Sequence, residues 1–314
     1  SNYVWSVWAL GKKFSGVSQT MSRFRGWIQA GATLLTNLHL PNFFKGGLYQ
    51  GTGKTVCVPG LNCYSCPAAS GACPIGAFQA VVGSSKFSFS YYITGFLILL
   101  GVLLGRFICG FLCPFGWFQE LLHKIPTKKL STKKLKPLTY LKYAVLLVMV
   151  FLLPAFLVND VGMGDPFFCK YLCPQGVLEG AIPLSLANSG IRAALGKLFT
   201  WKFSILLSVI ALSVLFYRPF CKWLCPLGAF YALFNRVSLF QMKVDKSKCV
   251  SCGKCARACK MDVDVTKTPN HTECIRCGMC IRACPTNAVC FRYGFGDGKE
   301  KENAATLREN NNKA

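Results

Sequence analysis

A cysteine followed by Pro-x-Gly occurs four times in this chain, each time beside a long apolar segment. Proline removes a backbone donor and ends the preceding conformation, and glycine lets the chain turn tightly into a following helix. At the start of a helix, the helix dipole favours a thiolate and an anionic metal cluster. The motif therefore predicts iron bound by cysteine at helix ends. Its four copies begin at Cys73, Cys113, Cys173 and Cys225.

The cysteine content supports metal ligation over two other interpretations. A lone cysteine beside an apolar helix is usually a packed core residue, but four copies of one motif argue against that. Nineteen cysteines would indicate disulfides in a small secreted protein. Here their spacings suit metal ligation, and disulfides are expected only among cysteines left over from the metal sites.

The overall composition predicts a membrane protein. The chain has 314 residues, of which 52% are hydrophobic and 15% charged, and its mean hydropathy is +0.37. The formal net charge of +24 is spread through short loops rather than gathered on one soluble domain. We therefore expect contact with anionic lipid, and we do not expect nucleic acid binding.

Four segments are apolar enough to be predicted as transmembrane helices, at residues 27–44, 91–108, 138–158 and 201–217. Polar residues interrupt the first, for which a buried or interfacial helix is the alternative. The loop at 124–136 is rich in lysine and contains no acid, so we place it in the cytoplasm. Both chain ends then lie in the cytoplasm, which predicts a multi-pass protein of the inner (cytoplasmic) membrane.

The cysteine motifs form an internal repeat. Residues 106–118 align with 218–230. Residues 66–77 align with 165–177, with a longer gap between the two cysteines, Cys66 and Cys73, of the first segment. Two spans per copy predict two parallel copies, at about 20–125 and 138–240, within an iron-sulfur domain at 1–240. The expected fold is thus a mainly α membrane protein with about four transmembrane helices.

This repeat groups the membrane cysteines into two sets of four thiolates, the number that a 4Fe-4S cluster requires. The inner set is Cys109, Cys113, Cys221 and Cys225. The outer set is Cys66, Cys73, Cys169 and Cys173. Cys63 is an alternative to Cys66, and a separate cluster on Cys57, Cys63, Cys66 and Cys73 is a further alternative.

The carboxyl-terminal part, at 241–295, contains two cysteine runs in tandem with the spacing C-x2-C-x2-C-x3-C. In bacterial ferredoxins the fourth cysteine of each run binds the other cluster, which predicts an α+β domain with two 4Fe-4S clusters. One cluster is assigned Cys249, Cys252, Cys255 and Cys284, and the other Cys274, Cys277, Cys280 and Cys259. Zinc is the weaker alternative for these spacings. Residues 296–314 are predicted to be a disordered tail.

From 63 to 284 the chain resembles the membrane-bound, polyferredoxin-like iron-sulfur proteins typified by NapH and NosR. This resemblance rests on the paired Cys-x3-Cys-Pro motifs after apolar segments and on the ferredoxin runs. It implies four or more transmembrane helices, 4Fe-4S clusters and electron transfer between a cytoplasmic or quinone donor and an extracytoplasmic partner. The third such pair, Cys169 and Cys173, departs from the family pattern.

These observations favour a transmembrane electron conduit with four 4Fe-4S clusters and no catalytic residue of its own. We expect it to be a subunit of an oxidoreductase complex. Its expected partners are a cytoplasmic ferredoxin-type protein or dehydrogenase and an extracytoplasmic flavin, haem or metalloenzyme protein. One alternative is a quinol or quinone oxidoreductase subunit, with Glu120 and His123 as proton-handling candidates. The other is a redox sensor or an assembly protein for a metalloenzyme.

Overall fold

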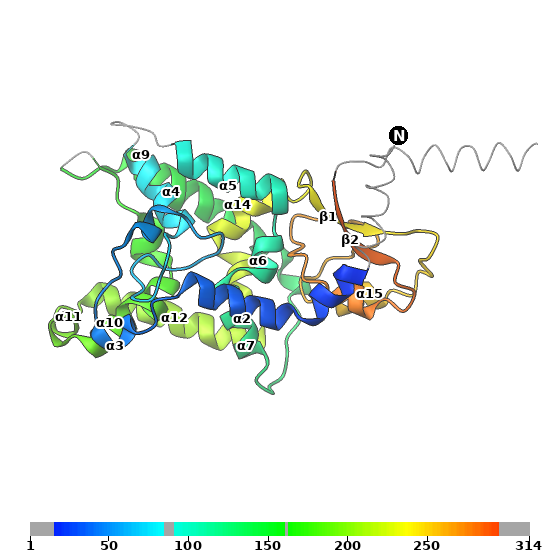
Figure 1. Ribbon diagram of the computed structural model, residues 1–314, viewed down its shortest axis with the longest axis horizontal. Coiled ribbons are helices and arrows are strands. Elements are labelled where there is room, and N and C mark those ends of the chain that lie inside the picture. The colour runs from blue at the N-terminus through cyan, green and yellow to red at the C-terminus, as the bar shows by residue number, and fades with distance from the viewer. Residues whose placement is uncertain (1–15, 85–90, 161–162, 295–314) are drawn as a thin grey trace, which may run out of the picture.

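The structure is a computed structural model that describes residues 16–84, 91–160 and 163–294. The predicted disordered tail at 296–314 lies outside the described residues. The molecule is elongated, with strands β1 and β2 near one end and helices α3, α10 and α11 at the other (Figure 1). Most of the described chain between these ends is helical.

The first half of the chain forms a series of short helices. After helical residues 16–23, these are α2 (Arg25–Thr36), α3 (Asn42–Lys45), η1 (Thr52–Thr55), α4 (Pro74–Gly83), α5 (Tyr91–Leu104), α6 (Phe107–Phe111) and α7 (Pro114–His123).

The second half contains the two longest helices. One is built from η2 (Lys133–Tyr140), α8 (Leu141–Val145), η3 (Leu146–Leu152) and α9 (Leu153–Phe156), and the other is α12 (Lys197–Leu215). The remaining helices here are η4 (Phe168–Leu172), η5 (Gly176–Ala181), α10 (Ile182–Ala187), α11 (Ser189–Ala193), α13 (Pro219–Trp223) and α14 (Pro226–Phe234).

Two helices among the described residues are long and apolar enough to cross a membrane: Lys133–Phe156, with 24 residues, and Lys197–Leu215, with 19. They correspond to the third and fourth predicted spans, shifted by a few residues. Their apolar side chains are largely exposed, as at Leu147, Phe151 and Leu207. A core helix would bury these side chains, so their exposure indicates an apolar surrounding or a partner.

The first two predicted spans are shorter as helices than the sequence suggested. α2 ends at Thr36, and its buried Arg25 and Gln29 both donate hydrogen bonds to the carbonyl oxygen of Gly110. One continuous helix over 27–44 is therefore wrong. α5 has 14 residues, about 21 Å at the usual helical rise, and it ends before Gly105, whose φ is +53°.

The carboxyl-terminal part is a small α+β module. β1 (Phe240–Val244) pairs with β2 (Val289–Tyr293) in an antiparallel sheet, with α15 (Lys254–Ala258) and α16 (Met279–Ala283) between them in sequence. Its left-handed residues recur at an offset of 25 positions, the offset that also relates its two cysteine runs. They are Ser251 and Arg276, Gly253 and Gly278, and Asp262 and Asn287. The two halves of the module thus share the same local backbone conformation.

A single large core connects this module to the helical part of the molecule. Buried Cys73, Cys113 and Cys225 belong to the same hydrophobic cluster as Met261 and Ile275 of the module. A second cluster, within the module and against α6, contains Phe107 and Phe291, whose rings meet edge to face. The motif cysteines therefore lie inside the protein core.

Candidate metal centres

Two cavities in the α+β module are lined by the cysteines that the spacing grouped together. The cysteines of the first cavity are Cys249, Cys252, Cys255 and Cys284. The cysteines of the second cavity are Cys259, Cys274, Cys277 and Cys280. In each cavity, three cysteines come from one run and the fourth from the other run.

Local backbone geometry explains how each run places its cysteines. Gly253 and Gly278 precede α15 and α16 with φ values of +69° and +76°, which glycine adopts without steric cost. Each short helix then buries its third cysteine, Cys255 or Cys280. The fourth cysteine of each run, Cys259 or Cys284, lies just after the helix in extended conformation. It lines the cavity formed mainly by the other run.

The four Cys-Pro-x-Gly motifs also share one geometry. Each cysteine is extended, with φ between −85° and −71° and ψ between 111° and 125°. At Cys225 the sulfur accepts a hydrogen bond from the backbone N–H of Gly228, at 3.3 Å. The cysteine thus caps α14 while proline occupies the first turn, where its missing N–H has no cost. This explains why the chemistry needs cysteine, proline and glycine at that spacing.

The first set of motif cysteines lies next to the α+β module and is called the proximal site: Cys109, Cys113, Cys221 and Cys225. Their thiols interact electrostatically with one another. Gln119 links the two halves of the site, because its Nε2 donates to Cys221 Sγ at 3.1 Å and its Oε1 accepts from the N–H of Phe220 at 3.2 Å. These are the four cysteines of the predicted inner set.

The second set lies further from the module and is called the distal site: Cys63, Cys73, Cys169 and Cys173. Its thiols also interact electrostatically with one another. Gln79 repeats the role of Gln119, since its Nε2 donates to Cys169 Sγ at 3.2 Å and its Oε1 accepts from the N–H of Phe168 at 3.0 Å. Gln79 and Gln119 each follow a motif cysteine by six residues.

At the distal site the structure favours Cys63, the alternative ligand, over Cys66. A Cβ at Gly176 would lie 3.8 Å from Cys63 Sγ, as a Cβ at Gly76 would lie 3.8 Å from Cys169 Sγ. The Glu179 carboxylate accepts from the N–H of Cys63 at 3.0 Å. Cys66 interacts with Cys63, but its thiol donates to Asn37 Oδ1 at 3.6 Å and packs in a small apolar cluster with Ala68 and Ala69. These contacts favour Cys63 over Cys66 as the fourth member of the set.

The separate amino-terminal cluster on Cys57, Cys63, Cys66 and Cys73 is not favoured by this arrangement. Cys63 and Cys73 are grouped with cysteines of the second half of the chain, whereas Cys66 packs with Ala68 and Ala69 beside Cys63. Cys57 is buried near Cys73, and burial raises the pKa of its thiol to about 11. Cys290, the remaining cysteine, lies on β2 opposite Lys243.

Two buried arginines at the proximal site, Arg106 and Arg218, stand at the first position of the two aligned segments 106–118 and 218–230. Each precedes the first cysteine of its segment by three residues, a common offset that is visible in the sequence and that we did not interpret from the sequence alone. Arg218 lies against Gly116, and Arg106 lies against Gly228, so each reaches the motif of the other half of the chain. Arg218 Nη1 also donates to the carbonyl oxygen of Cys109 at 2.5 Å.

Glu120 is the centre of an ion-pair network beside the proximal site. Its Oε1 lies 2.5 Å from Arg25 Nη2 and 2.9 Å from Arg218 Nε, and it accepts a hydrogen bond from Tyr217. Burial alone would raise the pKa of Glu120, but Arg218 and Arg25 lower it to about 2. Such a carboxylate is a fixed charge at neutral pH, which argues against a proton-handling role.

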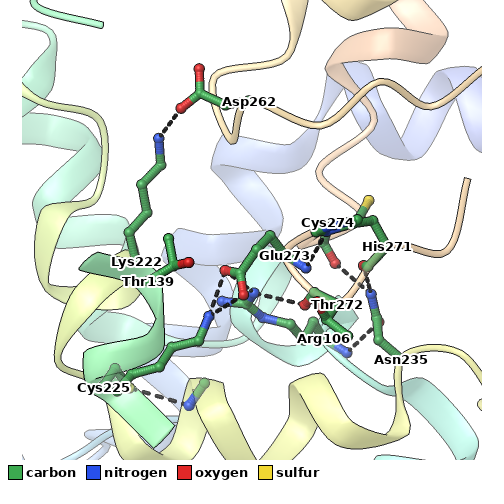
Figure 2. A network of polar contacts seen from close by, with 12 residues as sticks. Arg106, Thr139, Lys222, Cys225, Asn235, Asp262, His271, Thr272, Glu273 and Cys274 are labelled. Atoms are coloured by element: carbon green, nitrogen blue, oxygen red, sulfur yellow. Dashed lines mark hydrogen bonds and ion pairs between the residues drawn. The ribbon is translucent and has the colours of Figure 1, made fainter. Parts of the chain in front are cut away.

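The α+β module is fixed to the proximal site by buried ion pairs (Figure 2). Glu273 accepts from Arg106 Nη1 at 2.9 Å and from Lys142 Nζ at 2.5 Å. Nearby, Lys222 Nζ lies 3.0 Å from Asp262 Oδ2. Because Glu273 directly precedes Cys274, this network holds the second module cavity against the proximal site.

The chemistry of the sites fits 4Fe-4S clusters. Burial raises the pKa of Cys73 and of Cys113 to about 12, so these thiols stay protonated at neutral pH unless a metal replaces the proton. Each of the four sets supplies four cysteine sulfurs, the number of thiolates that a 4Fe-4S cluster requires.

Comparison with known proteins gives the same picture. A family model described as a 4Fe-4S binding domain matches residues 71–91, 88–133, 142–182 and 199–247, and one described as a 4Fe-4S dicluster domain matches 241–285. No solved structure matches the chain.

Several curated proteins are similar to the chain. An uncharacterized protein of Methanocaldococcus jannaschii is 32% identical over 63% of this chain and 77% of its own length. The regulatory protein NosR of Stutzerimonas stutzeri is 27% identical over 51% of this chain but only 21% of its own length. The ferredoxin-type protein NapH of Haemophilus influenzae is 26% identical over 35% of this chain and 52% of its own length. The chain thus belongs to the family of ferredoxin-type, 4Fe-4S-binding proteins that includes NapH and NosR.

Proposed function

We propose that this protein is a transmembrane electron conduit with four 4Fe-4S clusters in series. They would be held by the two module cavities, the proximal site and the distal site, in that order along the molecule. The chemistry that bound clusters would supply is one-electron exchange. The observation that carries the proposal is the continuous core, which contains three of the four cysteines of the distal site, of the proximal site and of the second module cavity.

Contacts between the sites support this order. The loop that carries Cys63 also touches the proximal site, where a Cβ at Gly60 would lie 2.8 Å from the Cα of Cys113. Tyr231 is fully buried between the two sites, and its hydroxyl donates to the carbonyl oxygen of Pro59 at 3.1 Å. Tyr231 interacts electrostatically with cysteines of both sites, so its ring fills part of the space between them.

The membrane-spanning part of the proposal rests on the two long, exposed apolar helices and on the basic loop at 124–136. That loop would place the module, the proximal site and both chain ends in or near the cytoplasm. The distal site would then face the opposite side. A cytoplasmic electron carrier and an extracytoplasmic redox protein are the proposed partners, with the chain acting as a subunit without catalysis of its own.

The test is iron content and vectorial transfer. Purified protein is expected to contain about sixteen irons and sixteen labile sulfides per chain, as four clusters require. Cys225→Ala should remove about four irons and preserve the module signals in paramagnetic resonance. In proteoliposomes, the wild type should reduce an impermeant acceptor from a donor on the other side, and Cys225→Ala should not. About eight irons in the wild type would contradict the proposal.

A redox-sensing role is the second candidate, because two of the similar proteins are named regulatory proteins. The proteoliposome experiment separates the two functions. A sensor would show full iron content and reversible reduction of the clusters without sustained transfer to the acceptor.

A further inference from the structure

Two arginines at the proximal site have buried N–H groups for which the described part of the chain offers no hydrogen-bond acceptor. Arg106 and Arg218 are both 0% exposed. Among the described residues, Nη2 of each has no hydrogen-bond acceptor. An unpaired buried polar group costs about 1–3 kcal/mol, and more when it is charged. Such groups in a folded protein indicate an acceptor that a ligand supplies.

Both guanidinium groups lie where helices α7 and α14 begin. A Cβ at Gly116 would lie 2.8 Å from Arg218 Nη1 and 3.2 Å from its Nη2, and a Cβ at Gly228 would lie 3.5 Å from Arg106 Nη2. These glycines are the last residues of the motifs that carry Cys113 and Cys225. The two guanidinium groups therefore approach the proximal thiols from the two halves of the chain.

The electrostatic interactions point the same way. Both arginines act on the thiol of Cys221, and Arg218 also interacts with Cys113. Arg106 interacts with Cys109. The two guanidinium charges therefore interact with the proximal cysteines as well as with the carboxylates of Glu273 and Glu120.

We propose that Arg106 and Arg218 donate hydrogen bonds to sulfur atoms of the proximal cluster and make it easier to reduce than the distal cluster. This rests on the proposed function, because it requires a cluster in the proximal site. Reduction adds one electron, needs no proton and makes the cluster one unit more negative. Positive charge and N–H donors near the sulfurs stabilise that reduced form and raise the reduction potential.

The distal site lacks this arrangement. The space at Gly76 is bordered by Cys169 Sγ, and the space at Gly176 by Cys63 Sγ and Lys202 Nζ, the latter at 3.5 Å. Lys202 already donates to the carbonyl oxygen of Cys169 at 3.0 Å. Glu179 adds an acidic group to the same site. The distal site thus has one ammonium group beside one of its motif glycines and a carboxyl group beside Cys63, and among the described residues no guanidinium group lies within 4 Å of a Cβ built at either glycine.

The test is a reductive titration of the full chain in detergent, followed by paramagnetic resonance. The proximal signal is the one that Cys225→Ala removes. In Arg106→Gln and Arg218→Gln, the ratio of reduced to oxidised proximal cluster at a fixed potential should fall about tenfold, which is 59 mV for a one-electron couple. The distal signal should keep its wild-type potential in both variants.

Arg25→Gln is the matched control for Arg218→Gln. It also removes a guanidinium group that pairs with Glu120, but Arg25 lies against neither proximal glycine, so the proximal potential should not change. An equal fall in this variant, or no fall in Arg106→Gln and Arg218→Gln at full iron content, would overturn the proposal.

If the glutamine variants lose the proximal cluster, the same titration is carried out on Arg106→Lys and Arg218→Lys. These variants keep the positive charge but lack the guanidinium group with its several N–H donors. Intermediate potentials would then support the proposal, and wild-type potentials would refute the hydrogen bonds. Failure of the proposed function is a separate result, because wild-type protein without proximal iron would show it before any arginine variant is compared.

Discussion

The proximal and distal sites use one cysteine motif but differ in what surrounds it. At the proximal site, the two halves of the chain exchange equivalent contacts, with Arg106 over Gly228 and Arg218 over Gly116. At the distal site, one half contributes Cys63 from a loop. The motif therefore sets where a sulfur lies relative to its helix, and residues outside the motif decide the charge around the site.

The residue six positions after each motif cysteine shows this difference most directly. Two copies have glutamine there, and both glutamines bond to a cysteine of the other half of the chain. The third has Glu179, which accepts from the N–H of Cys63, and the fourth has Tyr231, which bonds to the Pro59 carbonyl. One position thus supplies an amide, a carboxylate or a phenol.

The largest expected effect tests how the distal site is completed. Cys63→Ser should remove about four irons from the protein, because it deletes one of four cluster ligands. Cys66→Ser is the matched control and should retain full iron content, because Cys66 packs with Ala68 and Ala69, and its thiol donates to Asn37 Oδ1. Iron analysis of both purified variants checks this. Loss of iron in Cys66→Ser with full iron in Cys63→Ser would show that Cys66, and not Cys63, is the fourth ligand of the distal site.

The next effect tests the fixed charge beside the proximal site. Glu120→Gln leaves Arg25 and Arg218 without their carboxylate, and breaking a buried pair in this way costs about 3–5 kcal/mol of unfolding free energy. The pKa of Glu120 is lowered to about 2, so its contribution is complete above the unfolded value of about 4.3 and is lost only as pH falls towards 2.

The difference in melting temperature between wild type and Glu120→Gln should therefore be constant from about pH 5.5 to 8.5, well above both pKa values. Thermal unfolding in detergent measures it. A difference that shrinks within this range would show that Glu120 exchanges a proton there, as the quinone hypothesis requires.

The smallest effect compares equivalent glycines of the two sites. In Gly116→Ala the new Cβ would lie 2.8 Å from Arg218 Nη1, so a fully buried guanidinium must move. We expect a loss of about 1–3 kcal/mol of unfolding free energy, as for other overpacked sites. In Gly76→Ala the nearest atom is 3.7 Å away, an ordinary contact, and alanine in a helix is favoured by about 0.5–1 kcal/mol. Equal melting temperatures of the two variants would contradict this difference.

The cysteine groups of the module and the proximal site could be read from the sequence, because fixed spacings and a repeat determine them locally. The choice between Cys63 and Cys66 could not be made from the sequence, since the two cysteines lie in one loop, three positions apart. It depends on Glu179 and Gly176, more than 100 residues away. The end of α2 likewise involves a contact distant in sequence, because the N–H of Ser70 donates to the carbonyl oxygen of Thr36 at 2.9 Å.

The two buried arginines were visible in the sequence as a common position but not as a site. Basic residues near the ends of apolar helices are ordinarily interpreted as topology signals that face water or lipid headgroups. Only the structure shows that Arg106 and Arg218 are fully enclosed. Their burial depends on glycines in the opposite half of the chain, which no local pattern reports.

The close approach of the α+β module to Gly110 limits whether the module can move relative to the helical part or be replaced by a separate protein. A Cβ at Gly110 would overlap the carbonyl oxygen of Ile275, so the module backbone lies directly on α6. The helical residues before α2 hold its other side, where Ser18 Oγ accepts from the N–H of Phe291 at 3.1 Å. The module is therefore a docked part of the molecule rather than a carrier on a tether. A freely diffusing ferredoxin added in trans should not restore a chain truncated after Val237.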